Sequence, residues 1–227
     1  MTVAMADGAL PESVVTALYL RTRTLHVEAE RTGIIGDLLR GNASRDGYVL
    51  LLRNLLPAYQ AMERSLARHR KTPGLGALAN YRLDRAPAIE ADLSALCGKA
   101  WQRDVPLLPA GDNYARRITE AAQGNGARLI AHAYTRYLGD LSGGQILQRL
   151  LTRSLELWPD QLSFYDFPRH ADLTALKTGY REALDRAGSL VRDPAAVVEE
   201  GALAFTLNIE LSCAVQTALQ PSVTAAE

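Results

Sequence analysis

The sequence predicts an all-α fold in a single domain, and three observations support that prediction. Apolar residues recur with the 3.6-residue period of a helix along most of the 227-residue chain. No stretch alternates apolar and polar residues for long enough to form a strand. Alanine, leucine and arginine are abundant, whereas aromatic residues make up only 6% of the chain, which is typical of helical proteins.

Proline, serine and glycine residues predict the boundaries of the helices in the first 70 residues. Pro11 suits the first turn of a helix over residues 11–31. A short helical piece, loosened by glycines, follows as far as Gly41. Ser44 is a suitable N-cap for a long helix over residues 44–70, because its hydroxyl can accept a bond from a free amide of the first turn.

Later boundaries depend on further helix breakers. Pro57 is expected to kink the long helix, and residues 72–87, with two prolines and two glycines, are expected to form a loop. Pro159 should end another helix, since a residue before proline avoids helical backbone angles. The remaining helices are expected at residues 88–99, 112–123, 127–157, 171–187 and 193–219, with an aromatic loop over residues 163–170.

Composition also limits the number of domains, the classes of partner and the cellular compartment that we expect. A hydrophobic content of 48% suffices for one core, and no linker divides the chain, so we expect one domain over residues 11–219 with flexible termini at residues 1–10 and 220–227. The 25 basic and 25 acidic residues balance, which argues against nucleic-acid binding. No apolar run approaches the roughly 20 residues of a membrane span, and no secretory signal is evident. We therefore expect a cytoplasmic protein with no membrane partner, in which Cys97 and Cys213 are reduced.

The most informative segment lies inside the predicted helix over residues 127–157. It contains Gly139, Asp140, Gly143 and Gly144. A glycine inside a helix costs about 1 kcal/mol relative to alanine, so three of them within six residues need a reason. If the segment is helical, these residues share one stripe, and its bare backbone could contact something large and flat. The alternative is a turn between two helices.

Two histidines are candidate ligands. His26 lies on the first predicted helix, with Arg23 one turn before it and Glu30 one turn after it. A ligand histidine usually donates its second ring nitrogen to an acceptor, and Glu30 could be that acceptor. The spacing fits a metal or heme ligand, and it also fits an ordinary histidine paired with an acid on a helix face. His132, two turns before Gly139, is either a ligand or a hydrogen-bonded core residue.

The segment from His132 to Gln145, HAYTRYLGDLSGGQ, resembles the signature of the biliverdin-producing heme oxygenases. Further segments resemble that family in the same order, so that the resemblance covers residues 11–217. They lie at residues 25–30, 45–48, 59–63, 164–168, 177–181 and 205–209.

The resemblance implies a helical bundle that holds heme between a proximal helix and a kinked distal helix. His26 would be the iron ligand, with Glu30 holding its other ring nitrogen. Asp140 would anchor a water network shared with Tyr59 and Arg136. The other heme contacts would come from Arg23, Tyr134, Gly139, Gly143, Gly144, Lys177, Arg181 and Phe205.

The implied reaction is oxidative cleavage of heme b at its α-bridge, giving biliverdin, carbon monoxide and ferrous iron. Heme would be both cofactor and substrate, with O2 as co-substrate. Electrons would come from an external reductase or ferredoxin, because the chain has no flavin or iron–sulfur motif. The implied partners are heme, an electron-donor protein and a biliverdin-accepting protein, and we expect a monomer.

Two positions depart from the family pattern, and two other functions stay open. Tyr19 stands where many relatives have lysine, so one propionate contact is expected to be weakened or replaced. Ser212 stands where many have an aromatic residue, which is expected to loosen the distal pocket. Both bear on the cleavage position, for which the α-bridge stays the expectation. A non-catalytic heme carrier needs no proton relay, so Asp140 argues against it. A helical interaction protein with a degenerate site is disfavoured because His26 and Gly139 are in place.

Overall fold

The computed structural model describes residues 13–167 and 170–220, and these residues form an all-α structure without strands, as predicted. The predicted termini lie outside the described residues except for residue 220. The helices are α1 (Val14–Arg31), α2 (Gly33–Leu39), α3 (Arg45–Arg68), α4 (Leu75–Asn80), α5 (Ala86–Cys97), α6 (Trp101–Asp104), α7 (Pro109–Ala121), α8 (Leu129–Ala133), α9 (Gly139–Ser154), α10 (Leu173–Ser189) and α11 (Pro194–Ala218). A π-helical segment, η1 (Tyr134–Leu138), joins α8 to α9, and two 3-10 turns, η2 (Pro159–Gln161) and η3 (Ser163–Tyr165), follow α9.

Local capping explains where several helices begin. The Ser44 hydroxyl accepts a hydrogen bond from the amide of Gly47 and caps α3, as predicted. The Asp193 carboxylate does the same for α11 by accepting from the amide of Ala196. Because these bonds satisfy donors that have no partner inside the helix, each cap stabilises its helix by about 1 kcal/mol. Helix α3 continues through Pro57.

The predicted loop over residues 72–87 is wrong in part, because it contains helix α4 and the start of α5. Gly74 adopts a φ of 82°, a conformation that favours glycine, and directly precedes α4. Leu75 and Leu78 then bury the helix against the core, so tertiary packing overrides the local breakers. Pro87 lies in the first turn of α5, where no amide donor is needed.

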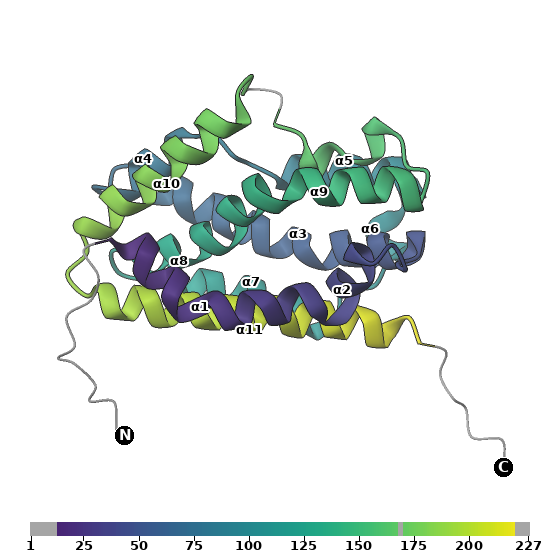
Figure 1. Cartoon of the computed structure of the whole chain (residues 1–227), viewed down its shortest axis with the longest axis horizontal. Helices are drawn as coiled ribbons and strands as arrows, with labels where there is room; N and C mark the ends of the chain where they lie inside the picture. The colour runs from purple at the N-terminus through teal and green to yellow at the C-terminus, as the bar shows by residue number, and fades with distance from the viewer. Residues whose placement is uncertain (1–12, 168–169, 221–227) are drawn as a thin grey trace, which may run out of the picture.

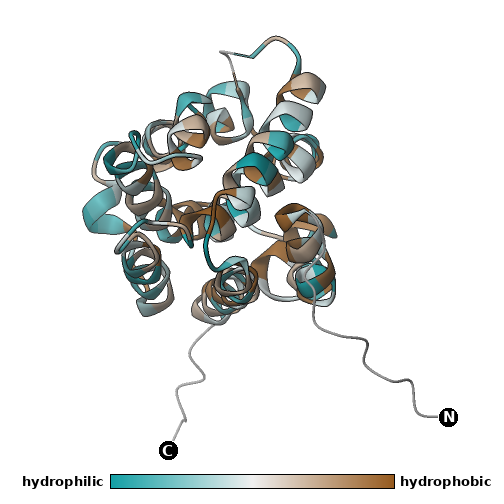
Figure 2. Ribbon diagram, turned by 90° about the vertical axis from the view of Figure 1, so that its left-hand side faces the viewer, coloured by the Kyte–Doolittle hydropathy of each residue, from teal (hydrophilic) through white to brown (hydrophobic). Residues whose placement is uncertain are grey.

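The bundle is arranged around α3, which contacts α4, α5, α7 and α11 (Figure 1). Helix α11 runs along α1 and also contacts α2, α7 and α8. Individual helices carry hydrophobic and hydrophilic residues on different sides (Figure 2), which is the pattern that builds one core. None of the helices in the described ranges combines the length and the hydropathy that a bilayer span requires.

Candidate active site

The glycine segment is helical along its whole length, so the alternative of a turn is wrong. Helix α8, segment η1 and helix α9 follow one another without a break over residues 129–154. Leu138 and Leu141, on either side of Gly139, are buried and hold this helix on the core. Their burial offsets the cost of the glycines, since most helix stability in proteins comes from tertiary packing. The π-helical turn lies directly before Gly139, and such turns are frequent at functional sites.

The three glycines lie in two different rows of this helix. A Cβ built on Gly139 or Gly143 would meet no atom within 4 Å among the described residues. Gly144 is buried, and a Cβ there would lie 3.2 Å from the ring of Tyr165. The expectation that all three share one free face is therefore corrected for Gly144. The reason is helical geometry, because Gly139 and Gly143 are four residues apart, whereas Gly144 belongs to the inward row of Asp140.

Asp140, Tyr59 and Arg136, which the sequence analysis grouped together, are joined by hydrogen bonds. The Tyr59 hydroxyl donates to Oδ2 of Asp140 at 2.6 Å. Nε and Nη2 of Arg136 donate to the same hydroxyl oxygen at 3.0 and 2.8 Å. Nη1 of Arg136 donates to Oδ1 of Asn208 at 2.5 Å. Asn208 lies in the resembling segment at residues 205–209 but had no assigned role.

Burial sets the protonation of this cluster. Burial raises the pKa of Asp140, although the Arg136 charge and the Tyr59 hydrogen bond act in the opposite direction. Burial also raises the pKa of Tyr59 well above its usual range, so its hydroxyl is neutral. Burial disfavours the charge of Arg136, but the neighbouring oxygens of Tyr59 and Asp140 outweigh it and raise the pKa of Arg136. Asp140 therefore holds a proton more readily than an ordinary aspartate, next to a permanent cation.

His26 and Glu30 lie on the exposed face of α1. Nδ1 of His26 is 3.7 Å from Oε1 of Glu30, and the two side chains are 55% and 54% exposed. The ring of Phe205, from α11, lies beside the imidazole, with 5.7 Å between ring centroids. Because Glu30 faces Nδ1, Nε2 is the ring nitrogen available to a ligand.

A cavity of about 570 Å³ opens beside His26. Its lining includes Arg23 and His26 from α1, together with Tyr134, the first residue of η1. Burial raises the pKa of Tyr134, while the Thr22 side chain and the charge of Arg181, in α10, act to lower it. Lys177 lies one turn before Arg181, and both side chains are exposed. The cavity therefore connects the His26 face of α1 with the helix that carries Gly139.

Two other positions have structural roles. His132 is 0% exposed, and its Nε2 lies 2.9 Å from Oε1 of Glu200, so of the two alternatives it is the hydrogen-bonded core residue. The Ser212 hydroxyl donates to the carbonyl of Thr32 and accepts from the amide of Ile35. A Cβ on Gly33 would lie 2.4 Å from Oγ of Ser212, so α11 approaches the α1–α2 junction closely at this point.

Known proteins resemble this chain in sequence. The family model described as heme oxygenase matches residues 12–214. The chain belongs to the heme oxygenase family. Heme oxygenase 1 of Homo sapiens is 36% identical over 208 residues, which cover 89% of this chain and 71% of that protein. Heme oxygenase 1 of Nostoc sp. is 34% identical over 203 residues, covering 89% of this chain and 85% of that protein.

Solved structures of heme oxygenases agree with the fold. Heme oxygenase-1 from the cyanobacterium Synechocystis sp., in complex with heme, superposes with a TM-score of 0.83 at 30% identity, covering 91% of this chain and 93% of that one. Heme oxygenase from Leptospira interrogans superposes with a TM-score of 0.83 at 32% identity, covering 88% and 98%. The all-α fold and the membership of this enzyme family are thus confirmed, and the chain is an enzyme of the heme oxygenase class.

Proposed function

We propose that this protein cleaves heme oxidatively at the α-bridge and releases biliverdin, carbon monoxide and ferrous iron. One observation carries the proposal: a hydrogen-bonded Asp140 adjoins Gly139, where the helix has open space, and an exposed His26 lies on the cavity that reaches the same helical segment. Helix backbone without side chains, next to the buried carboxyl of Asp140, suits a planar ligand that must receive a proton.

The donors and the open backbone on this chain support heme as the ligand. His26 would bind the iron through Nε2, while Glu30 orients the ring from the Nδ1 side. The free Cβ directions at Gly139 and Gly143 let a macrocycle approach the backbone. The remaining contacts that we propose are made by propionate-binding cations and by neighbouring rings, namely Arg23, Lys177, Arg181, Tyr134 and Phe205.

The distal residues hold and deliver protons. When bound, heme supplies both the iron that activates O2 and the ring that is oxidised. The Tyr59 hydroxyl fixes Oδ2 of Asp140, and Oδ1 lies 3.5 Å from Nη2 of Arg136, which leaves Oδ1 able to bind a water molecule. A carboxyl with a raised pKa can give its proton through that water and regain it. Arg136 stays charged throughout and keeps the cluster in place.

The partners belong to the same proposal. O2 is the co-substrate, and an external reductase or ferredoxin donates the electrons. We further propose a cytoplasmic monomer that passes biliverdin to an accepting protein. The domain limits at residues 11 and 219 stay a prediction.

The decisive experiment is aerobic turnover of bound hemin. The protein is titrated with hemin, reduced with ascorbate under air, and the product is separated alongside the four biliverdin isomers. Formation of α-biliverdin and carbon monoxide is expected. Heme that is bound but not consumed would contradict the proposal and support a heme carrier.

Asp140→Asn tests the proposed proton delivery. We expect this variant to bind hemin with an unchanged affinity, because Asp140 does not contact the iron in the proposed arrangement. Biliverdin formation should fall by about 10²-fold or more, which is the usual contribution of a general acid. Hemin titration and single-turnover rates measure the two effects separately. Undiminished biliverdin formation would remove Asp140 from the mechanism.

A further inference from the structure

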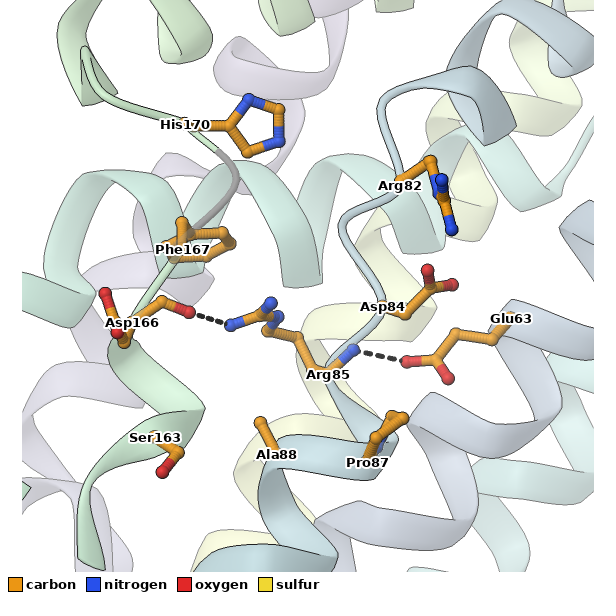
Figure 3. Close-up of a pocket in the computed structure, with 10 residues that line it drawn as sticks. All are labelled: Glu63, Arg82, Asp84, Arg85, Pro87, Ala88, Ser163, Asp166, Phe167 and His170. Carbon is orange, nitrogen blue, oxygen red and sulfur yellow. Dashed lines mark hydrogen bonds between the residues drawn. The ribbon is translucent and has the colours of Figure 1, made fainter. Parts of the chain in front are cut away.

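Polar groups outside the proposed heme site gather at two places. The first is a cavity of about 460 Å³ whose lining includes Glu63 and Arg85 (Figure 3). Nε and Nη1 of Arg85 donate to the carbonyls of Leu83 and Phe164. Oε1 of Glu63 accepts from the amides of Arg85 and Ala86. Because each of these bonds engages the backbone, the two charged groups support the fold of the cavity wall.

The second place is the junction between α1, which carries His26, and α2. Thr32 is the C-cap of α1 and also the N-cap of α2. Gly33 follows it with a φ of 59°, a left-handed conformation that favours glycine. The helical path is therefore interrupted at Thr32, six residues beyond His26 and two residues beyond Glu30.

Ser212, in α11, supplies the cap that α2 lacks locally. The Thr32 side chain makes no capping bond to α2, and its hydroxyl donates back to the carbonyl of Glu28 in α1. The amide of Ile35, in the first turn of α2, donates instead to Oγ of Ser212 at 3.1 Å. The same hydroxyl donates to the carbonyl of Thr32 at 3.3 Å. One side chain thus satisfies a free amide of α2 and binds the end of α1.

Two further contacts hold α11 against the same junction. Nε2 of Gln216, one turn after Ser212, donates to the carbonyl of Gly33 at 3.4 Å and to Oδ2 of Asp37 at 2.5 Å. A Cβ on Gly33 would collide with the backbone and the hydroxyl of Ser212. Helix α11 therefore lies so close to the junction that only a residue without a side chain fits at position 33.

Helix α11 connects this junction with the imidazole of His26. It runs along α1 (Figure 1), and Phe205, two turns before Ser212, lies beside the His26 ring. Helix α2 in turn contacts α9, the helix that carries Gly139 and Gly143. The junction thus joins the helix of the proposed iron ligand to an element that packs on the distal helix.

The pair of His26 and Glu30 is sensitive to the position of the last turn of α1. Its separation of 3.7 Å is longer than a hydrogen bond, so a small shift of Glu30 decides how strongly the two side chains interact. Glu30 lies in that last turn, which ends where the amide and the hydroxyl of Thr32 both donate to the carbonyl of Glu28. A contact that fixes Thr32 therefore also fixes the turn that carries Glu30.

We propose that Ser212 is a positioning residue which, packed on Gly33, fixes the end of α1 and so sets how closely Glu30 faces Nδ1 of His26. The proposal rests on the function proposed above, in which His26 binds the heme iron. Ser212 is 1% exposed and acts through the backbone of Thr32. An acceptor on the second ring nitrogen raises the basicity of a ligand imidazole, so this contact tunes the proposed iron ligand from a distance.

Ser212→Ala and Gly33→Ala test this role in different ways. The first removes the hydroxyl and both of its bonds, and the second keeps the hydroxyl but forces α11 away from the junction. In the heme-free protein, hydrogen exchange at the Ile35 amide should become about fivefold faster in Ser212→Ala, because the amide loses its cap. In the ferrous heme complex, resonance Raman spectroscopy should show a lower and broader iron–histidine stretching band in both variants.

The matched control is Thr206→Val, which removes a hydroxyl from the same helix. That hydroxyl donates to the carbonyl of Ala202 within α11, so the variant should change neither measurement. A double variant tests whether Ser212 acts through Glu30. Glu30→Gln should lower the stretching frequency by itself, and adding Ser212→Ala should lower it no further.

An unchanged stretching band in both Ser212→Ala and Gly33→Ala would overturn the positioning role. So would an equal shift in Thr206→Val, or a full additional shift when Ser212→Ala is added to Glu30→Gln, because each indicates a general loosening of the bundle. Wild-type protein without any iron–histidine band would instead overturn the ligation by His26 on which the proposed function depends.

Discussion

At the scale of single residues, the proposed chemistry depends on one imidazole and one carboxyl with opposite surroundings. His26 is exposed and its acid partner Glu30 is equally exposed, so the ring is accessible to a large ligand. Asp140 is buried among a neutral hydroxyl and a guanidinium, so its proton is controlled by neighbours rather than by bulk water. Because His26 and Asp140 are separate residues, one substitution can abolish the proposed heme ligation and another can abolish proton delivery.

His26→Ala should therefore abolish the proposed iron ligation without unfolding the protein, because the side chain is exposed. We expect the histidine-ligated heme spectrum to disappear and hemin affinity to fall at least tenfold. Added imidazole should restore the spectrum. The control is His69→Ala, which removes an imidazole that is hydrogen-bonded to the Ala122 carbonyl. An unchanged heme spectrum in His26→Ala would exclude His26 as the ligand.

Residue roles were only partly visible in the sequence. Asp140, Tyr59 and Arg136 could be grouped through the family resemblance, and the structure joins them. Asn208 lay within the resembling segment at residues 205–209 but was given no role there, and only the structure shows its bond to Arg136. Glu63 was quoted only as part of a resemblance, since nothing local distinguishes it from an exposed glutamate on a helix.

At the scale of elements, the distal helix combines a free row and a packed row. The free row, Gly139 and Gly143, is next to the buried row of Asp140 and Gly144. The sequence predicted a stripe of glycines with correct helical spacing. It did not reveal that Tyr165 covers Gly144, because Tyr165 reaches the helix from η3.

Gly143→Leu should separate stability from ligand binding. The new side chain enters open space and replaces a poor helix former, so the heme-free protein should gain up to about 1 kcal/mol in its free energy of unfolding. Hemin binding should fall, because the leucine occupies the proposed ligand space. Urea unfolding and hemin titration measure the two effects.

Gly144→Ala is the matched control for that variant. Its Cβ would press on the Tyr165 ring, so we expect a small loss of stability and nearly normal hemin binding. Normal hemin affinity in Gly143→Leu would show that heme does not lie on this row.

At the scale of the whole molecule, buried acids make stability depend on pH. Burial raises the pKa of Glu63 to about 7 and that of Asp92 to about 6. Between their ordinary and raised values, the folded protein binds more protons than the unfolded chain, so the free energy of unfolding falls as pH rises. His132 acts in the opposite sense, because burial lowers its pKa and its stabilising contribution is lost as pH falls below about 6.5.

The heme-free Glu63→Gln variant isolates one of these contributions. Because glutamine does not ionise, its Tm relative to wild type should rise from pH 5 to about pH 7 and then level off. Thermal unfolding at unit pH steps measures the difference. A constant difference in Tm across this range would show that Glu63 is not shifted in the folded protein.

Local chemistry by itself determined that the chain is helical and where most helices begin and end. Caps such as those of Ser44 and Asp193 act within a few residues, so the printed sequence contains the whole interaction. Tertiary structure alone decided which glycines stay uncovered, which amide holds Arg136, and that Glu63 borders a cavity. Those features depend on contacts between segments that are far apart in the chain. Such contacts form only when the core packs, and no local sequence pattern predicts them.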